Sequence, residues 1–163
     1  MYFILFICFV ISQRLIELII AKKNEKWVRS LGAIEYGQSH YPFIILLHTM
    51  FIISMVIEYV CSRGIFISTF LWVFFVLEIL KAWVISSLGK YWNTKILRVP
   101  GLLFVKKGPY KLFKHPNYFI VICEIIIIPM VFNLYLTAII FTILNAIMLT
   151  VRIMEEEKVW AAI

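Results

Sequence analysis

The segment LGKYWNTKILRVPGLLFVKKGPYKLFKHPNY at residues 88–118 is the longest stretch of the chain that is too polar to lie in lipid. Its glycines and prolines predict several defined turns in place of one continuous helix. It holds no acidic residue, and its seven basic residues are Lys90, Lys95, Arg98, Lys106, Lys107, Lys111 and Lys114. This combination indicates more than a connector, and we refer to residues 88–118 as the basic segment.

The chain on either side of the basic segment is strongly apolar. Of the 163 residues, 63% are hydrophobic and the mean hydropathy is +0.97, whereas a soluble domain is roughly 45–50% apolar. We therefore expect an integral membrane protein with a single domain over residues 1–163. The first 20 residues lack a basic start and a small-residue cleavage site, which favours a retained helix over a signal peptide.

Three apolar blocks each have the length of about 20 residues that crosses a bilayer; they lie at 2–21, 42–61 and 65–85. A fourth block, at 117–151, is too long for one crossing. Pro129 and Asn133 lie in its middle, where proline removes a helix hydrogen bond and asparagine favours a turn. We predict an all-α fold of five transmembrane helices, with the last two forming a hairpin whose first arm is short.

The distribution of basic residues predicts the orientation of the chain in the membrane. The loop after the first span carries Lys22, Lys23, Lys26 and Arg29, whereas the second loop has only Arg63. By the positive-inside rule, the first loop and the basic segment are cytosolic, the N-terminus lies outside and the C-terminal tail lies inside. This asymmetry and anionic membrane lipid account for the net charge of +7, so we expect no nucleic-acid partner.

Other classes of protein are disfavoured by composition. The cysteines, Cys8, Cys61 and Cys123, have no CxxC spacing, and all nine acidic residues are glutamates, so no metal site is predicted. The chain shows no internal repeat, which disfavours an inverted-repeat transporter.

Several ionisable residues lie within the predicted spans, where a charge usually faces a cavity or a partner. Arg14 with Glu17, and Glu78 with Lys81, are spaced to pair on one helix face. They either pair and reach towards the membrane surface or contact a ligand head group. His48 is interpreted as a buried histidine with its hydrogen bonds satisfied.

Two further groups of polar residues indicate a polar cavity. Glu124 has no cation beside it in the sequence, so its partner lies on another helix or it lines a cavity. At the end of the last span, a helical stripe places four residues on one face: Asn145, Leu149, Arg152 and Glu156. Carboxylates at 155–157 oppose the helix dipole. They are either a solvated helix end or the partners of a cation from the basic segment or a ligand.

From about residue 82 to residue 160, the chain resembles the isoprenylcysteine carboxyl methyltransferase family of membrane enzymes. The resemblance rests on LG with a tryptophan at 88–92, GPY at 108–110, HPNY at 115–118 and RIMEEE at 152–157. These match a GxY turn and the family patterns RHPxY and RIxxEExxL. The details resemble the bacterial branch that methylates alkylpyrones and alkylresorcinols, which implies a bacterial cell membrane.

The resemblance implies S-adenosylmethionine as cofactor, bound between HPNY and the glutamates of the last helix. It implies that residues 86–163 form the cofactor-binding part and that residues 1–85 form the substrate-side part. Aromatic faces suit the sulfonium, carboxylates suit the ribose or ammonium, and a histidine suits the carboxylate or adenine. The expected cofactor-binding residues are Trp92, Gly108, Tyr110, His115, Tyr118, Asn145, Glu156 and Glu157.

Three positions depart from the family pattern. Lys114 replaces the arginine before HP, which gives a point charge in place of a two-pronged donor. Trp160 replaces the leucine after EE, and residues 102–105 lack a histidine that is common before the GxY turn. Adenine recognition is therefore the least specified part of the comparison.

The implied reaction transfers a methyl group to an oxygen of a lipophilic small molecule or lipidated acceptor that enters from the bilayer. A carboxylate acceptor is already ionised, whereas a phenol or enol must lose a proton, for which Glu124 or Glu156 is a candidate. Lys114 or Arg152 is expected to orient the acceptor oxygen, and Arg14 and Glu17 to contact the head group.

Two other functions remain open from the sequence alone. The fold is also used by longer membrane reductases with a nicotinamide cofactor. A small lipid-binding scaffold without enzymatic activity would share the composition. The sequence does not specify the oligomeric state.

Overall fold

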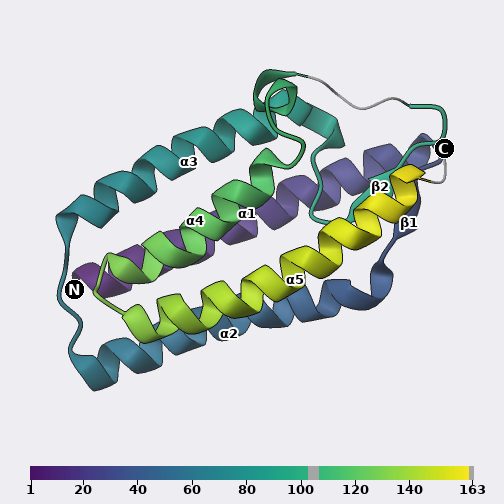
Figure 1. The fold of residues 1–163 in the computed structure, drawn as a ribbon. Coiled ribbons are helices and arrows are strands. Elements are labelled where there is room, and N and C mark those ends of the chain that lie inside the picture. Colours follow the sequence, from purple (N-terminus) through teal and green to yellow (C-terminus); the bar gives the residue numbers. More distant parts are fainter. Residues whose placement is uncertain (103–106, 162–163) are drawn as a thin grey trace.

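The structure is a computed structural model that describes residues 1–102 and 107–161 (Figure 1). Residues 103–106, which include Lys106 and most of the positions compared for a family histidine, lie outside the described part. The five helices are α1 (Tyr2–Ser30), α2 (Tyr41–Ser62), α3 (Ser68–Leu88), α4 (Pro116–Met130) and α5 (Tyr135–Ala161). The short elements are β1 (Ile34–Tyr36), η1 (Gln38–His40), η2 (Gly89–Tyr91), β2 (Ile96–Arg98) and η3 (Gly108–Lys111).

The all-α membrane fold predicted from the apolar blocks is confirmed. Helices α1, α2, α3 and α5 are long and apolar enough to cross a membrane, and α4 is a shorter apolar helix of 15 residues. Large apolar side chains cover the outer surface of the bundle. Trp72 and Ile79, for example, are each 70% exposed. Such a surface is stable in lipid but not in water.

Helices α1 and α5 are longer than the apolar blocks predicted. Helix α1 continues to Ser30 and α5 to Ala161, whereas the apolar blocks end near residues 21 and 151. Because neither polar extension contains glycine or proline, nothing in the local sequence stops the helix where the apolar residues end. Both extensions reach the same end of the bundle (Figure 1).

The predicted hairpin between α4 and α5 is also confirmed. Asn133 adopts a positive φ of 58° in the turn, and the Leu134 amide donates to the Pro129 carbonyl at 3.1 Å. On α2, Glu58 accepts hydrogen bonds from two backbone amides in the first turn of α5: Leu136 at 3.1 Å and Thr137 at 2.7 Å. A carboxylate at this position satisfies free amides and complements the helix dipole.

An aromatic core fills the bundle at the hairpin end. Phe3 of α1 stacks on Tyr59 of α2 with ring centroids 3.7 Å apart and meets Phe132 of the hairpin edge-on at 5.1 Å. Phe6 and Phe74 extend this cluster between α1 and α3, with ring centroids 5.2 Å apart. This end of the bundle is therefore filled with aromatic side chains.

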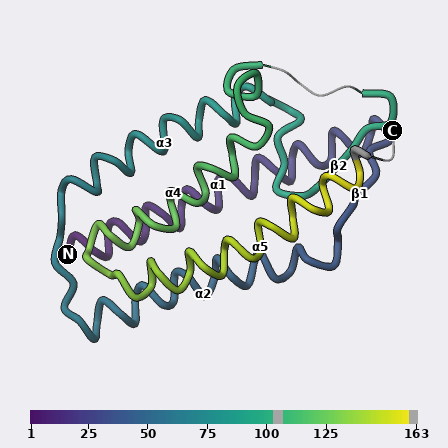
Figure 2. Tube along the Cα trace, viewed as in Figure 1, coloured from purple at the N-terminus to yellow at the C-terminus, as the bar shows by residue number. Residues whose placement is uncertain are grey.

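At the opposite end, a short antiparallel sheet joins the first loop to the basic segment. Strands β1 and β2 pair with Glu35 opposite Leu97. Lys95 contacts Glu25 of α1 at 2.9 Å and Glu35 at 3.4 Å. Figure 2 shows the C-terminal end of α5 at this end and the N-terminus at the other. The basic segment thus forms defined turns, as its glycines and prolines predicted.

The Glu58 cap gives a first prediction. Replacing Glu58 with alanine should lower the free energy of unfolding by about 1–2 kcal/mol, because two amides at the start of α5 lose their acceptor. Thermal unfolding in detergent measures the change. Cys61→Ala, on the same helix and exposed, is the control and should unfold as the wild type does. Equal stability of both variants would contradict the capping role.

Candidate functional site

A cluster of opposite charges lies inside the bundle, contributed by α1, α3 and α4. Glu124 accepts from Arg14 Nη2 at 2.8 Å and from Lys81 Nζ at 2.9 and 3.0 Å. Glu17 contacts Arg14 at 3.1 Å and Lys81 at 2.6 Å. The side chains of Glu124 and Lys81 are 0% and 3% exposed. We call Arg14, Glu17, Lys81 and Glu124 the buried charge cluster.

The cluster resolves what the sequence left open about these charges. The expectation that Glu124 has its partner on another helix is confirmed. Arg14 and Glu17 form the expected pair, but Lys81 turns to Glu17 and Glu124, whereas Glu78 accepts from Gln13 of α1. Pairing between helices replaces pairing along α3 because Glu124 is buried and needs both cations.

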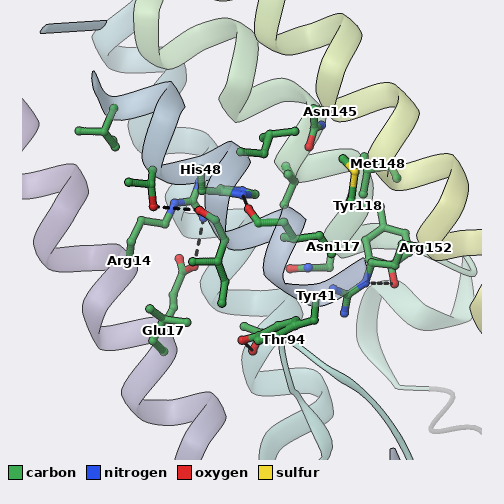
Figure 3. Close-up of a pocket in the computed structure, with 18 of the residues that line it drawn as sticks. Arg14, Glu17, Tyr41, His48, Thr94, Asn117, Tyr118, Asn145, Met148 and Arg152 are labelled. Carbon is green, nitrogen blue, oxygen red and sulfur yellow. Dashed lines mark hydrogen bonds and ion pairs between the residues drawn. The ribbon is translucent and has the colours of Figure 1, made fainter. Parts of the chain in front are cut away.

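A cavity of about 430 Å³ lies beside the cluster, between α1, α2, α4 and α5 (Figure 3). Most of its lining is apolar, and Arg14, Glu17, His48 and Asn145 are among the polar residues along it. In Figure 3, Arg14 and Glu17 lie on one side and Arg152 with Tyr118 on the other. We call this space the apolar cavity.

A second cavity of about 200 Å³ lies between the basic segment, the start of α4 and the end of α5. It is lined by Tyr110, Lys114, His115 and Glu156, among others, and we call it the loop cavity. Both cavities share the same five residues: Trp92, Asn93, Asn117, Tyr118 and Arg152. The two spaces are therefore neighbours with a common wall.

Hydrogen bonds around Tyr118 hold this common wall together. Arg152 Nε donates to the Tyr118 hydroxyl at 2.8 Å, and that hydroxyl donates to Glu156 at 2.6 Å. The His115 ring stacks on Tyr118 with centroids 5.1 Å apart and planes 8° from parallel. Burial raises the pKa of the neighbouring Tyr110 phenol well above its usual range, and the negative charge of Glu156 adds to this rise.

Three polar atoms at the loop cavity are buried without a hydrogen-bond partner among the described residues. They are Trp92 Nε1, His115 Nε2 and Asn117 Oδ1. Leaving a buried polar atom unpaired costs about 1–3 kcal/mol. All three belong to residues that line the loop cavity, which makes this cavity a candidate ligand site with both donors and acceptors to spare.

The structure brings most of the predicted cofactor-binding residues together. Trp92, Tyr110, His115, Tyr118 and Glu156 all line the loop cavity. Asn145, of the same predicted set, lines the apolar cavity instead.

Gly108 and Glu157 line neither cavity. A Cβ on Gly108, whose φ is +52°, would meet Ser87 Oγ of α3 at 2.3 Å, so this glycine allows the turn to pack on α3. Glu157 pairs with Lys114 at 2.9 Å, and both side chains are about half exposed.

The other predicted site residues fall at different places. Arg14 and Glu17 line the apolar cavity, Lys114 lines the loop cavity, and Arg152 lines both. Glu124 lines neither, and its carboxylate is fully engaged by Arg14 and Lys81. Its predicted part in catalysis stays a prediction.

Sequence reasoning missed Asn93 of the common wall and Asn24, which holds the neighbouring Trp92. Asn93 donates to the Ala21 carbonyl of α1 at 3.1 Å and accepts from the Lys95 amide at 3.1 Å, which fixes the chain after η2. Asn24 of α1 donates to the Trp92 carbonyl at 2.8 Å. In the sequence, the available signal for this contact was an asparagine among the charged residues at the end of the first helix.

Comparison with known proteins identifies the family. The profile of the isoprenylcysteine carboxyl methyltransferase (ICMT) family matches residues 67–162, more than half of the chain. The chain therefore belongs to this family of membrane methyltransferases, as the motifs predicted.

Two relatives align over nearly the whole chain. The protein YpbQ of Bacillus subtilis (strain 168) is 46% identical over 159 residues, which cover 96% of this chain and 95% of YpbQ. A second relative is a protein of Haemophilus influenzae (strain ATCC 51907 / DSM 11121 / KW20 / Rd). It is 29% identical over 159 residues, which cover 95% of this chain and 92% of the relative. Neither name states an activity. No solved structure matches the chain.

The buried charge cluster gives a second prediction. Glu124→Leu should lower the free energy of unfolding by about 3–5 kcal/mol, because two buried cations are left with one carboxylate. Glu124→Leu combined with Lys81→Met removes one charge of each sign and should recover a large part of this loss. Thermal unfolding of both variants in one detergent measures the effect. A double variant no more stable than Glu124→Leu would show that the charges do not stabilise the bundle as a cluster.

Proposed function

We propose that the chain is an S-adenosylmethionine-dependent O-methyltransferase that acts within the membrane on a lipophilic acceptor. The observation that carries the proposal is the pair of cavities with a common wall. The loop cavity has the more polar lining and includes family motif residues, whereas the apolar cavity is lined mainly by apolar residues of the helices. Such a pair brings a water-soluble donor and a lipid-soluble acceptor to one place.

The residues at the loop cavity fit the chemistry of the cofactor. Asn117 Oδ1 is a free acceptor for an ammonium or amino group, whereas Trp92 Nε1 is a free donor for an anionic or carbonyl oxygen. Tyr110 offers an aromatic face to the sulfonium, and Glu156 adds a negative charge nearby. The cofactor would supply the methyl group as an electrophile.

The apolar cavity fits the tail and head group of an amphiphilic acceptor. Its volume, about 430 Å³, lies within the range of roughly 300–1,000 Å³ typical of small-molecule sites. We propose that the acceptor enters laterally from the bilayer. Its polar group is an alkylpyrone- or alkylresorcinol-like hydroxyl, or a prenylcysteine-type carboxylate.

In this proposal, the protein contributes positioning rather than covalent chemistry. Arg152 lies at the common wall, where its guanidinium can orient the acceptor oxygen, while Tyr118 and Glu156 hold it in place. Lys114 adds positive charge on the loop side. Arg14 and Glu17 contact the acceptor, and Glu124 holds Arg14 in position.

The proposal includes the division of the chain and its orientation. All residues that line the loop cavity belong to 86–163 except Val28 of α1, which suits a cofactor-binding part. Residues 1–85 supply α1, α2 and most of α3, which suit a substrate-binding part. By the positive-inside rule, the end with the basic segment faces the cytosol. The cofactor is made in that compartment.

Thermal stabilisation of the purified protein by S-adenosylhomocysteine tests the function. This compound should raise the unfolding temperature of the wild type, and NADPH should not. Stabilisation by NADPH alone would favour a reductase. Stabilisation by neither compound would contradict the methyltransferase proposal and favour a lipid-binding scaffold.

A point variant tests the site itself. His115→Ala should bind S-adenosylhomocysteine about tenfold more weakly in calorimetric titration, because His115 Nε2 is one of the free polar atoms at the loop cavity. Lys158→Ala is the matched control, because Lys158 is exposed and pairs with Glu155 outside both cavities. Equal weakening in both variants would place the ligand elsewhere.

A further inference from the structure

The turn that contains η3 lies against the end of α3 (Figure 1). Gly108 packs so closely there that a Cβ would lie 2.3 Å from Ser87 Oγ and 3.3 Å from Trp83 Nε1. Trp83 is half exposed, and a tryptophan near the end of a membrane-spanning helix is typical of the level of the lipid head groups. The turn therefore lies at the membrane surface.

Two large apolar side chains at the tip of this turn are not covered by the rest of the protein. Leu112 is 77% exposed and Phe113 is 66% exposed. The backbone amides of both residues donate to the carbonyl oxygen of Pro109, at 3.1 and 3.0 Å, so the backbone of the tip is held in a defined turn. Large apolar side chains that are exposed together mark a contact with a membrane or a partner.

The apolar tip continues the lipid-facing surface of the neighbouring helices. Trp83 near the end of α3 and Phe119 near the start of α4 are both exposed. Helix α3 is long and apolar enough to cross the membrane, so its exposed side chains face lipid. Because the tip lies between the ends of these two helices in the chain, lipid is the partner that reaches it without displacing anything.

Basic residues without partners accompany the apolar tip. Lys107 and Lys111 are exposed, and neither forms an ion pair with a residue that the structure describes. Residues 107–114 contain no acidic residue. A lysine close to a membrane increases its association with anionic lipid by about fivefold. Apolar side chains beside free lysines match a surface in which negative head groups lie over acyl chains.

The same turn forms part of the wall of the loop cavity. Tyr110 lies within the turn and His115 follows it directly, and both line that cavity. Pro109, between Gly108 and Tyr110, is buried. Some residues of the turn thus line the cavity while others are free on the outside. A contact that fixes the exposed residues also fixes the positions of Tyr110 and His115.

We propose that Lys107, Lys111, Leu112 and Phe113 dock on anionic lipid at the membrane surface, and that this contact strengthens ligand binding in the loop cavity. The two apolar side chains enter the lipid, and the two lysines bind the head groups. The second part rests on the proposed function, because it makes anionic lipid a regulator of the cofactor site. The docking itself does not depend on any cofactor.

A spin label at the tip tests the docking. The label is attached through Phe113→Cys in a variant with Cys8→Ala, Cys61→Ala and Cys123→Ala. In nanodiscs that contain phosphatidylglycerol, the label should collide more often with oxygen dissolved in the lipid than with a water-soluble nickel chelate. A label attached through Lys158→Cys, at an exposed position near the end of α5, is the control and should show the reverse.

Two results of the labelling experiment would overturn the proposal. The first is a label at residue 113 that is as accessible to water as the label at residue 158. The second is broadening of the spectrum by a nearby second label, which would show that another copy of the chain covers the tip.

Ligand affinity in two lipid mixtures tests the effect on the loop cavity. The wild type should bind S-adenosylhomocysteine about fivefold more tightly in nanodiscs with phosphatidylglycerol than in phosphatidylcholine alone. Lys107→Gln with Lys111→Gln should remove this difference. Lys22→Gln with Lys23→Gln is the matched control, because it removes the same charge from exposed positions of α1 and should keep the difference. Equal loss in both double variants would overturn the coupling.

The two measurements separate this proposal from the proposed function. If S-adenosylhomocysteine binds in neither lipid mixture while the label lies in lipid, the methyltransferase proposal falls and the docking stands. If the compound binds equally tightly in both mixtures, the proposed function stands and the coupling is wrong. The label measurement needs neither lysine variant, so it decides the docking even if one of them fails to fold.

Discussion

The arrangement of the bundle depends on one buried carboxylate. Glu124 is fully buried in α4 and accepts hydrogen bonds from Arg14 of α1 and Lys81 of α3. A lone carboxylate at this depth would be prohibitively costly, so the three helices must approach until both cations reach it. Helix α4 is shorter than the four helices long enough to cross a membrane, and this cluster ties it to α1 and α3. The start of α4, with His115 and Tyr118, is thereby set beside the end of α5.

That placement is what creates two different environments on either side of a common wall. The wall residue Tyr118 is oriented by Arg152 and Glu156, both from the polar extension of α5. On one side the lining is the more polar of the two and comes mainly from the basic segment. On the other side it is apolar and comes from the spans. In the proposed function, a methyl group passes between a water-soluble donor and a membrane-bound acceptor, and a shared wall would allow this without exposing the acceptor to water.

The sequence predicted the helices well because the signals involved are local. Apolar length identified the spans, and Pro129 with Asn133 identified the hairpin. The motif residues Trp92, Tyr110, His115, Tyr118 and Glu156 were expected to meet, and they do. What could not be predicted depends on how helices rotate and pack. The partners of Lys81 and the place of His48 in the wall of the apolar cavity follow from such packing. The strands β1 and β2 have three residues each, too few for an alternating pattern to be visible.

The central claim is that one chain joins a methyl donor to a lipid-soluble acceptor. The most direct test is to incubate bacterial membranes that contain the protein with S-adenosylmethionine labelled in its methyl group, and to extract the lipids. Label in the lipid extract that is absent from membranes with a Glu156→Gln variant is the predicted result. No label in lipid or in protein, from membranes in which the wild-type protein is folded, would contradict the account.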